Sequence, residues 1–152
     1  ISPAKRFRID AGVILLCSFL ITLPVYFWGI PGGADMPQHF QFAQTFYDSL
    51  ADGTLYPSWS AATNYGYGDV GIRFYPPLTY YVLSFFRLLA GNWYEGTCLA
   101  IVFFFFLSGI GAYKWAREFA GENSALFGAV FYLLVPYHVS QIYQATMIAE
   151  FA

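Results

Sequence analysis

Three long runs of apolar residues, separated by polar segments, are the main pattern along the chain. The runs cover residues 11–30, 96–113 and 124–143, and none of them contains Lys, Arg, Asp or Glu. About 20 apolar residues are needed to cross the hydrocarbon core of a bilayer, so each run predicts a transmembrane helix. A signal peptide is the alternative for the first run, but no small-residue cleavage site follows it.

Two shorter helices are expected between the first and second runs. Residues 36–51 carry apolar side chains at helical spacing and polar side chains on the other faces, which is typical of an amphipathic helix lying in the membrane interface. Two prolines open a second helix near 76–90, whose apolar run is short for a span. A loop rich in turn-forming and aromatic residues separates the two helices.

The basic residues distinguish two topologies, because cytoplasmic segments are enriched in Lys and Arg. If 76–90 stays on the outer side, residues 1–10 and 114–123 are cytoplasmic, residues 31–95 form an outer loop, and 144–152 begin a second outer segment. This topology keeps five of the seven basic residues inside, so it is the one we expect, although a full crossing by 76–90 stays open. The five residues are Lys5, Arg6, Arg8, Lys114 and Arg117.

The composition agrees with a membrane protein. Hydrophobic residues make up 58% of the 152 positions and charged residues 11%, against about 25% charged residues in soluble domains. The net charge of −2 carries no indication of nucleic acid, and there is no basic patch; membrane lipid is the expected partner, and no nucleic acid is expected. The expected fold is all-α and polytopic, with amphipathic juxtamembrane helices in a long outer loop. The chain starts at Ile1 and stops within a helical pattern, so we expect the N-terminal part of a larger protein.

The strongest candidate for chemistry is Asp35, which directly follows the first run, with His39 four residues later. If a helix starts there, both side chains point to one face. A carboxylate at the membrane surface can act as a general base or a metal ligand. The alternatives are that Asp35 caps the helix opened by Met36-Pro37 and that His39 is a polar residue of the interface.

Three other charged residues are considered for a functional role, and each also has a simple structural explanation. Glu150 lies among apolar residues, where an ionisable group is costly and often functional, unless the third span has ended and Glu150 faces water. Arg73 precedes Phe74-Tyr75 and could hold a phosphate or anchor the chain at the interface. Arg87, inside the short helix, is expected to extend its charged end to water.

Several motifs occur in a fixed order and carry a resemblance to known proteins. They are Gly33-Ala34-Asp35, Gly53-Thr54-Leu55-Tyr56-Pro57-Ser58-Trp59, Asn64-Tyr65-Gly66-Tyr67-Gly68, Phe74-Tyr75-Pro76-Pro77-Leu78 and Ala149-Glu150-Phe151-Ala152. This order resembles the bacterial multi-pass membrane proteins labelled "6-pyruvoyl-tetrahydropterin synthase-related". The layout is also similar to that of the polyprenyl-phosphate-sugar-dependent membrane glycosyltransferases of GT-C type.

The resemblance implies a glycosyltransferase-like protein of the inner membrane that acts on its outer face. Asp35 matches the acidic residue that follows the first span in that superfamily, and 36–51 and 76–90 match its juxtamembrane helices. Asp35 would then be the catalytic base, and a polyprenyl-phosphate-linked sugar the donor. A divalent metal would be compatible with this chemistry, but no cofactor is indicated. The residues expected to bind substrate are His39, Trp59, Tyr65, Tyr67, Arg73 and Glu150.

One segment departs from the pattern of the resembled family, and two other classes of protein are alternatives to a glycosyltransferase. The family commonly has an arginine before the Ala-Glu-Phe-type motif, whereas this chain has Gln144-Ala145-Thr146, which weakens the role of Glu150. A transporter of a lipid-linked glycan would show ionisable residues or broken helices inside its spans, and the three runs carry no Lys, Arg, Asp or Glu. A non-catalytic protein of envelope assembly is the other alternative.

Overall fold

The computed structural model describes residues 2–33 and 35–145 of the chain, and within these residues helices are the regular secondary structure. Residues Ser60 and Asp69 form an isolated antiparallel bridge. The all-α, polytopic fold expected from the sequence is confirmed. The elements are α1 (Pro3–Trp28), α2 (Met36–Ala51), the 3₁₀ turns η1 (Asn64–Gly66) and η2 (Gly71–Phe74), α3 (Pro77–Ala90), α4 (Trp93–Ala116), α5 (Glu122–Leu133), α6 (Pro136–Ser140) and the π-helical turn η3 (Gln141–Ala145).

Three helical segments of the described chain are long and apolar enough to cross a membrane: Pro3–Trp28, Trp93–Ala116 and Glu122–Tyr143. The first has 26 residues, or about 39 Å at a rise of 1.5 Å per residue, against a hydrocarbon core of about 30 Å. It begins eight residues before the predicted run. Ser2 caps its N-terminus, since its hydroxyl oxygen accepts a hydrogen bond from the Lys5 amide. The basic N-terminal residues are therefore part of the helix.

The third long segment is interrupted, whereas the sequence pattern suggested one span near 124–143. Helix α5 ends at Leu133 and α6 starts at Pro136. Proline has no amide hydrogen and clashes with the carbonyl four residues earlier, which here belongs to Tyr132. That carbonyl oxygen accepts a hydrogen bond from the Val135 amide at 3.3 Å and lies 2.9 Å from Nδ1 of His138. The break thus has a local cause, and His138 has a structural partner at it.

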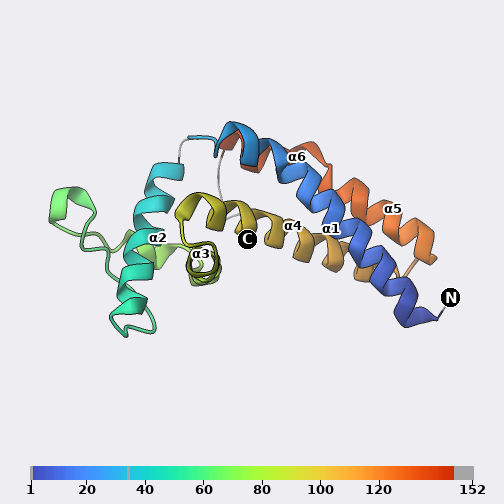
Figure 1. Ribbon diagram of the computed structural model, residues 1–152, viewed down its shortest axis with the longest axis horizontal. Helices are drawn as coiled ribbons and strands as arrows, with labels where there is room; N and C mark the ends of the chain where they lie inside the picture. Colours follow the sequence, from blue (N-terminus) through green and yellow to red (C-terminus); the bar gives the residue numbers. More distant parts are fainter. Residues whose placement is uncertain (1, 34, 146–152) are drawn as a thin grey trace. The chain divides into compact units, whose positions relative to one another are not determined.

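By their internal contacts the residues form two compact units, Ile1–Ile30 with Ile101–Ser140, and Pro31–Ala100 with Gln141–Ala152. In the first unit α1 and α5 run side by side (Figure 1). A Cβ atom on Gly109 of α4 would lie 2.6 Å from Cγ2 of Ile14 and 3.2 Å from Cδ1 of Leu133. Because glycine stands there, α1, α4 and α5 approach closely around two fully buried aliphatic side chains.

A buried carboxylate joins the same three helices. Asp10 of α1 has no exposed surface. The Nε atom of Arg6, one turn earlier, donates to both Asp10 oxygens at 3.0 and 3.1 Å, and the Tyr113 hydroxyl donates to Asp10 Oδ2 at 2.6 Å. A terminal nitrogen of Arg6 also donates to Oδ1 of Asn123 at 2.5 Å. Arg6, Asp10, Tyr113 and Asn123 are called the polar clamp below.

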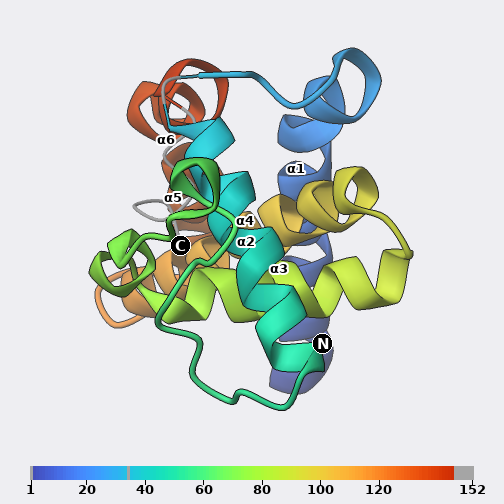
Figure 2. The ribbon, with the colours of Figure 1, turned by 90° about the vertical axis from the view of Figure 1, so that its left-hand side faces the viewer.

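The second unit is built on α2 and α3, which cross steeply (Figure 2). The amphipathic face of α2 buries Phe42 and Phe46, and both rings contact the fully buried Tyr80 of α3. Helix α3 has 14 residues, or about 21 Å, which is shorter than a hydrocarbon core of about 30 Å. This length agrees with a helix that stays on one side of the membrane, and that placement stays a prediction.

Helix α4 starts directly against α3, because Gly96 has no side chain. A Cβ atom there would lie 2.8 Å from both Cα and N of Arg87. Backbone atoms cannot rotate away as the end of a long side chain can, so the contact depends on glycine. The approach places Trp93, one turn before Gly96, beside α2 and α3, where its ring contacts Phe40 and Tyr47.

We predict that Asp10→Asn lowers the free energy of unfolding by about 2–3 kcal/mol. This is less than the roughly 3–5 kcal/mol for breaking a fully buried pair, because the Arg6 side chain is 27% exposed. Thermal unfolding of the purified protein in detergent measures the effect. Glu118→Gln, at an exposed carboxylate of the same unit, should change the midpoint little. An equal shift in the two variants would show that the polar clamp is not the cause.

We also predict opposite effects for two glycine substitutions in α4. Gly96→Ala should destabilise the protein by about 1–3 kcal/mol, as overpacking does. Gly111→Ala should be neutral or stabilising by up to about 1 kcal/mol, because nothing lies within 4 Å of its Cβ position and alanine favours helix. The two melting temperatures measured against wild type test this. A shift of the same sign and size for both would contradict the close approach at Arg87.

Candidate functional site

The Asp35 carboxylate stands at the start of α2, where none of the described residues gives it a hydrogen bond or an ion pair. Asp35 occupies the N-cap position, but its side chain makes no capping hydrogen bond, and its backbone is in the αR region, where cap residues are rarely found. Its backbone carbonyl accepts a hydrogen bond from the His39 amide at 3.0 Å. Within the described residues the half-buried side chain makes no hydrogen bond or ion pair, so the capping role considered from the sequence has no bond to support it.

His39 is buried one turn away, among aromatic side chains. Its Nδ1 atom lies 3.2 Å from the Tyr80 hydroxyl, and its ring meets the Tyr75 ring edge to face with centroids 4.9 Å apart. Burial lowers the pKa of His39, and the nearby Asp35 carboxylate opposes this without reversing it. Burial, and then Tyr75, raise the pKa of Tyr80. The imidazole and the phenol are therefore both neutral near pH 7.

His39 also faces a small cleft between α2, α3 and the start of α4. The cleft is lined by His39 and Thr97 together with the apolar residues Met36, Phe40, Ala43, Leu83 and Trp93. The Thr97 hydroxyl is buried and has no hydrogen-bond partner in the described structure. A buried polar group without a partner costs about 1–3 kcal/mol. The cleft is therefore small and apolar, with the buried side chains of His39 and Thr97 at its wall.

The structure brings Asp35 and His39 together but does not connect the other predicted residues to them. Arg73 is exposed on η2, and Tyr75, two residues later, is the residue that reaches His39. Trp59 covers Gly68, where a Cβ atom would lie 2.1 Å from the indole and where φ is +80°. Glu150 and the 149–152 motif lie outside the described residues.

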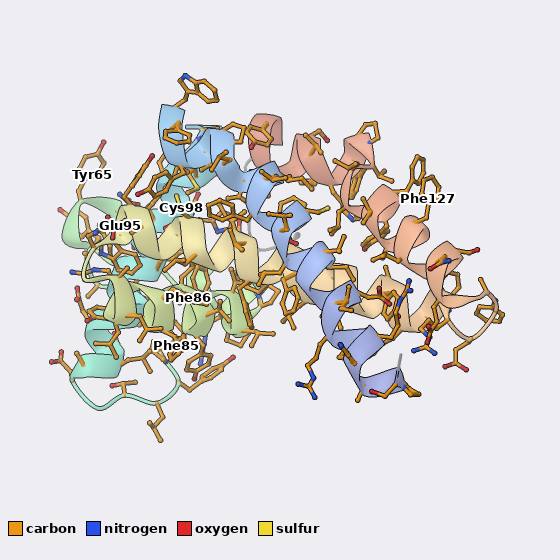
Figure 3. All side chains as sticks on the ribbon, turned by 45° about the vertical axis from the view of Figure 1, so that its right-hand side comes forward. Tyr65, Phe85, Phe86, Glu95, Cys98 and Phe127 are labelled. Atoms are coloured by element: carbon orange, nitrogen blue, oxygen red, sulfur yellow. The ribbon has the colours of Figure 1, made fainter. Side chains whose placement is uncertain are left out.

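Two of the predicted aromatic residues project from the loop. Tyr65 is 101% exposed and points away from the chain (Figure 3), and its φ of +56° is uncommon for a residue with a side chain. Tyr67 is 83% exposed. Two backbone hydrogen bonds between Ser60 and Asp69, at 2.9 and 3.0 Å, hold the base of this segment. The loop therefore has a defined shape while its aromatic tip is open to a ligand or a lipid surface.

Tyr75, Tyr80 and Thr97 were not among the site residues expected from the sequence. The signal for Tyr80 was present, since Tyr80, Leu83 and Ser84 recur at helical spacing and mark the buried face of α3. Nothing in the local sequence indicated that Tyr75 or Thr97 would approach His39. For the metal considered from the sequence, no group of three His, Cys, Asp or Glu side chains in residues 2–33 and 35–145 is placed to hold an ion.

We predict that His39 makes stability depend on pH. Its folded pKa lies below the ordinary value of 6.5, so between the two values the unfolded chain binds more protons. Stability should be fully present above pH 6.5 and decrease as the pH falls towards the folded pKa. Melting temperatures from about pH 5 to 8 test this. His39→Gln should flatten the slope, whereas Gln38→Ala, at an exposed neighbour, should keep it. An unchanged slope in His39→Gln would rule out His39 as the source.

Comparison with known proteins gives a family for the chain. A family model described as "6-pyruvoyl-tetrahydropterin synthase related domain; membrane protein" matches residues 72–152, which is just over half of the 152 residues. The match includes α3, α4, α5 and α6, and its description as a membrane protein agrees with the two long apolar segments that lie within it, Trp93–Ala116 and Glu122–Tyr143. No curated protein and no solved structure matches the chain. The chain therefore belongs to the 6-pyruvoyl-tetrahydropterin synthase related family of membrane proteins.

Proposed function

We propose that this membrane protein acts as a glycosyltransferase, moving a sugar from a polyprenyl-phosphate donor to an acceptor of the cell envelope on the outer face of the inner membrane. The observation that carries the proposal is the Asp35 carboxylate, which has no hydrogen bond or ion pair within the described residues. It lies beside the neutral His39 at the start of a juxtamembrane helix. A free carboxylate in a half-buried position is suited to accept a proton.

The reaction proposed is a direct displacement. The acceptor hydroxyl gives its proton to Asp35 while its oxygen forms a bond to the anomeric carbon of the donor sugar. The bond from that carbon to the phosphate oxygen breaks, and the polyprenyl phosphate leaves with the electron pair. The reaction needs a base near the acceptor and positive charge near the leaving phosphate. Arg73, exposed and without an ion pair in the described structure, is proposed for the phosphate.

The remaining predicted residues would bind the sugar or the lipid. Aromatic rings stack on the apolar faces of sugars, and Trp59, Tyr65 and Tyr67 are exposed enough to do so. His39 can hold a substrate hydroxyl as a neutral donor or acceptor. Glu150 keeps its proposed substrate-binding role on sequence grounds alone.

Transport of a lipid-linked glycan is a second candidate, favoured by one observation. The third long segment, Glu122–Tyr143, is broken near its middle at Pro136. Discontinuous helices near the bilayer midplane often form substrate sites in transporters. The two functions differ in what Asp35 does, since a transporter would not need it as a base.

We predict that Asp35→Asn in the full-length protein, in its native membrane, lowers sugar transfer by about 10²–10⁴-fold, the usual contribution of a general base. Polyprenyl-phosphate sugars and the envelope glycan are quantified by mass spectrometry at equal protein level. One lipid-linked sugar should accumulate while one glycan is lost. The control is Asp48→Asn, an exposed carboxylate on the same helix, which should behave as wild type.

Two other outcomes would redirect the assignment. No change in any lipid-linked sugar would reject Asp35 as a catalytic base and leave a non-catalytic protein of envelope assembly. Normal transfer by Asp35→Asn in an opened-membrane assay, combined with loss of glycan in intact cells, would favour transport. In that assay the donor reaches the enzyme without crossing the bilayer, so only the chemical step is measured.

A further inference from the structure

Arg87 is a cation in an unusual setting. Its guanidinium carbon lies 5.6 Å from the centre of the Tyr47 ring of α2 and 5.8 Å from that of the Trp93 ring of α4. The two rings meet edge to face with centroids 5.7 Å apart. These two rings hold the guanidinium against the protein. The sequence had suggested instead that the Arg87 side chain extends its charged end to water. Residues Tyr47, Arg87 and Trp93 are called the arginine cage below.

No anion of the described chain pairs with Arg87. Within residues 2–33 and 35–145, ion pairs join Arg6 to Asp10 and Glu122, and Arg117 to Glu122. Of the five carboxylates in 31–100, none forms an ion pair with Arg87 in the described structure. The Nε atom of Arg87 is buried without a hydrogen-bond partner. An arginine presents five N–H donors in a planar fork that matches a phosphate, so most of the binding capacity of Arg87 is unused.

A second unpartnered polar group lies one turn earlier on the same helix. The Ser84 side chain belongs to a residue that is only 5% exposed, and its hydroxyl has no hydrogen-bond partner in the described structure. Ser84 lines a groove between α2 and α3 whose wall also contains Tyr47 of the cage. Arg87 does not itself line the groove, but it lies one turn after Ser84 and over the Tyr47 ring, so it stands at the edge of the groove.

The rest of the groove is apolar and open to the surroundings. It is lined by Tyr47, Leu50, Ala51, Tyr81, Ser84, Phe85 and Leu88. Phe85 (labelled in Figure 3) and Leu88 are 55% and 68% exposed. An amphipathic helix in a membrane interface presents such a face to acyl chains. A ligand that is anionic at one end and hydrocarbon at the other therefore matches both the arginine cage and the apolar groove.

We propose that the arginine cage and the α2–α3 groove bind a phosphate-bearing lipid of the bilayer. The lipid phosphate accepts hydrogen bonds from Arg87 and Ser84, and one acyl chain lies along Leu50, Phe85 and Leu88. Free inorganic phosphate would satisfy Arg87 but would leave the apolar wall uncovered. This lipid site does not depend on the proposed glycosyl transfer, because Asp35 is not part of the lipid site.

The experiment measures lipid binding to the purified full-length protein in a nonionic detergent by native mass spectrometry. The probes are dioleoyl phosphatidylglycerol, dioleoylglycerol with the same chains but no phosphate, and inorganic phosphate as a competitor. Wild type should prefer phosphatidylglycerol to dioleoylglycerol. Arg87→Gln should weaken phosphatidylglycerol binding by about tenfold or more, which equals about 1.4 kcal/mol and is typical of a lost charge-assisted hydrogen bond. Arg8→Gln, at an exposed cation, should have a small effect.

A second variant keeps the test decisive if Arg87→Gln does not fold. Leu88→Gln changes an exposed side chain of the groove and should weaken phosphatidylglycerol binding while leaving the binding of inorganic phosphate alone unchanged. Equal losses in Arg8→Gln and Arg87→Gln would overturn the proposal in favour of general electrostatic attraction. Full displacement of the lipid by inorganic phosphate at matched concentration would overturn it in favour of a free-phosphate site. Unchanged binding in both groove variants would also reject it.

Discussion

The fold depends on one property of hydrocarbon, which is that it supplies no hydrogen-bond partner. Every polar group that enters the bilayer must therefore be satisfied by the chain itself. Helices satisfy most of the backbone, and two polar groups of the first unit that regular helix geometry does not satisfy have specific partners. His138 faces the Tyr132 carbonyl, which the Pro136 nitrogen cannot bond, and the Asp10 carboxylate accepts three hydrogen bonds from two donors, Arg6 Nε and the Tyr113 hydroxyl. The first unit is organised around these two compensations.

The second unit follows a different rule, because it leaves polar groups uncompensated. The hydroxyls of Ser84 and Thr97 and the Nε atom of Arg87 are buried without partners in the described structure, and the Asp35 carboxylate makes no bond. Native proteins keep few such groups, and each one calls for an explanation. Their concentration around α2, α3 and the start of α4 is what suggests that this part of the protein binds ligands.

The elements of the fold could largely be predicted from the sequence, but the contacts of the site could not. Charge-free runs and amphipathic spacing predicted the helices, and α2 has the predicted bounds of 36–51. Local sequence did reveal the Asp35–His39 pair, since its spacing lies within one helix. It could not reveal that Tyr75 and Tyr80 surround His39, or that Trp93 closes on Arg87, because those contacts depend on how helices cross. The predicted span began at residue 11 because it was taken from the charge-free run, whereas α1 begins at Pro3. The charges of Arg6 and Asp10 pair within the helix, so they do not interrupt it.

That compensation has a consequence for how the protein is made. Tyr113 and Asn123 lie more than a hundred residues after Asp10, so they do not yet exist when the first helix leaves the ribosome. Only Arg6 can then neutralise Asp10, and its position one turn away means that the nascent helix carries its own counter-ion into the translocation machinery. The pair is overall uncharged, so Lys5 and Arg8 are the cations at the start of α1 whose charge Asp10 does not offset.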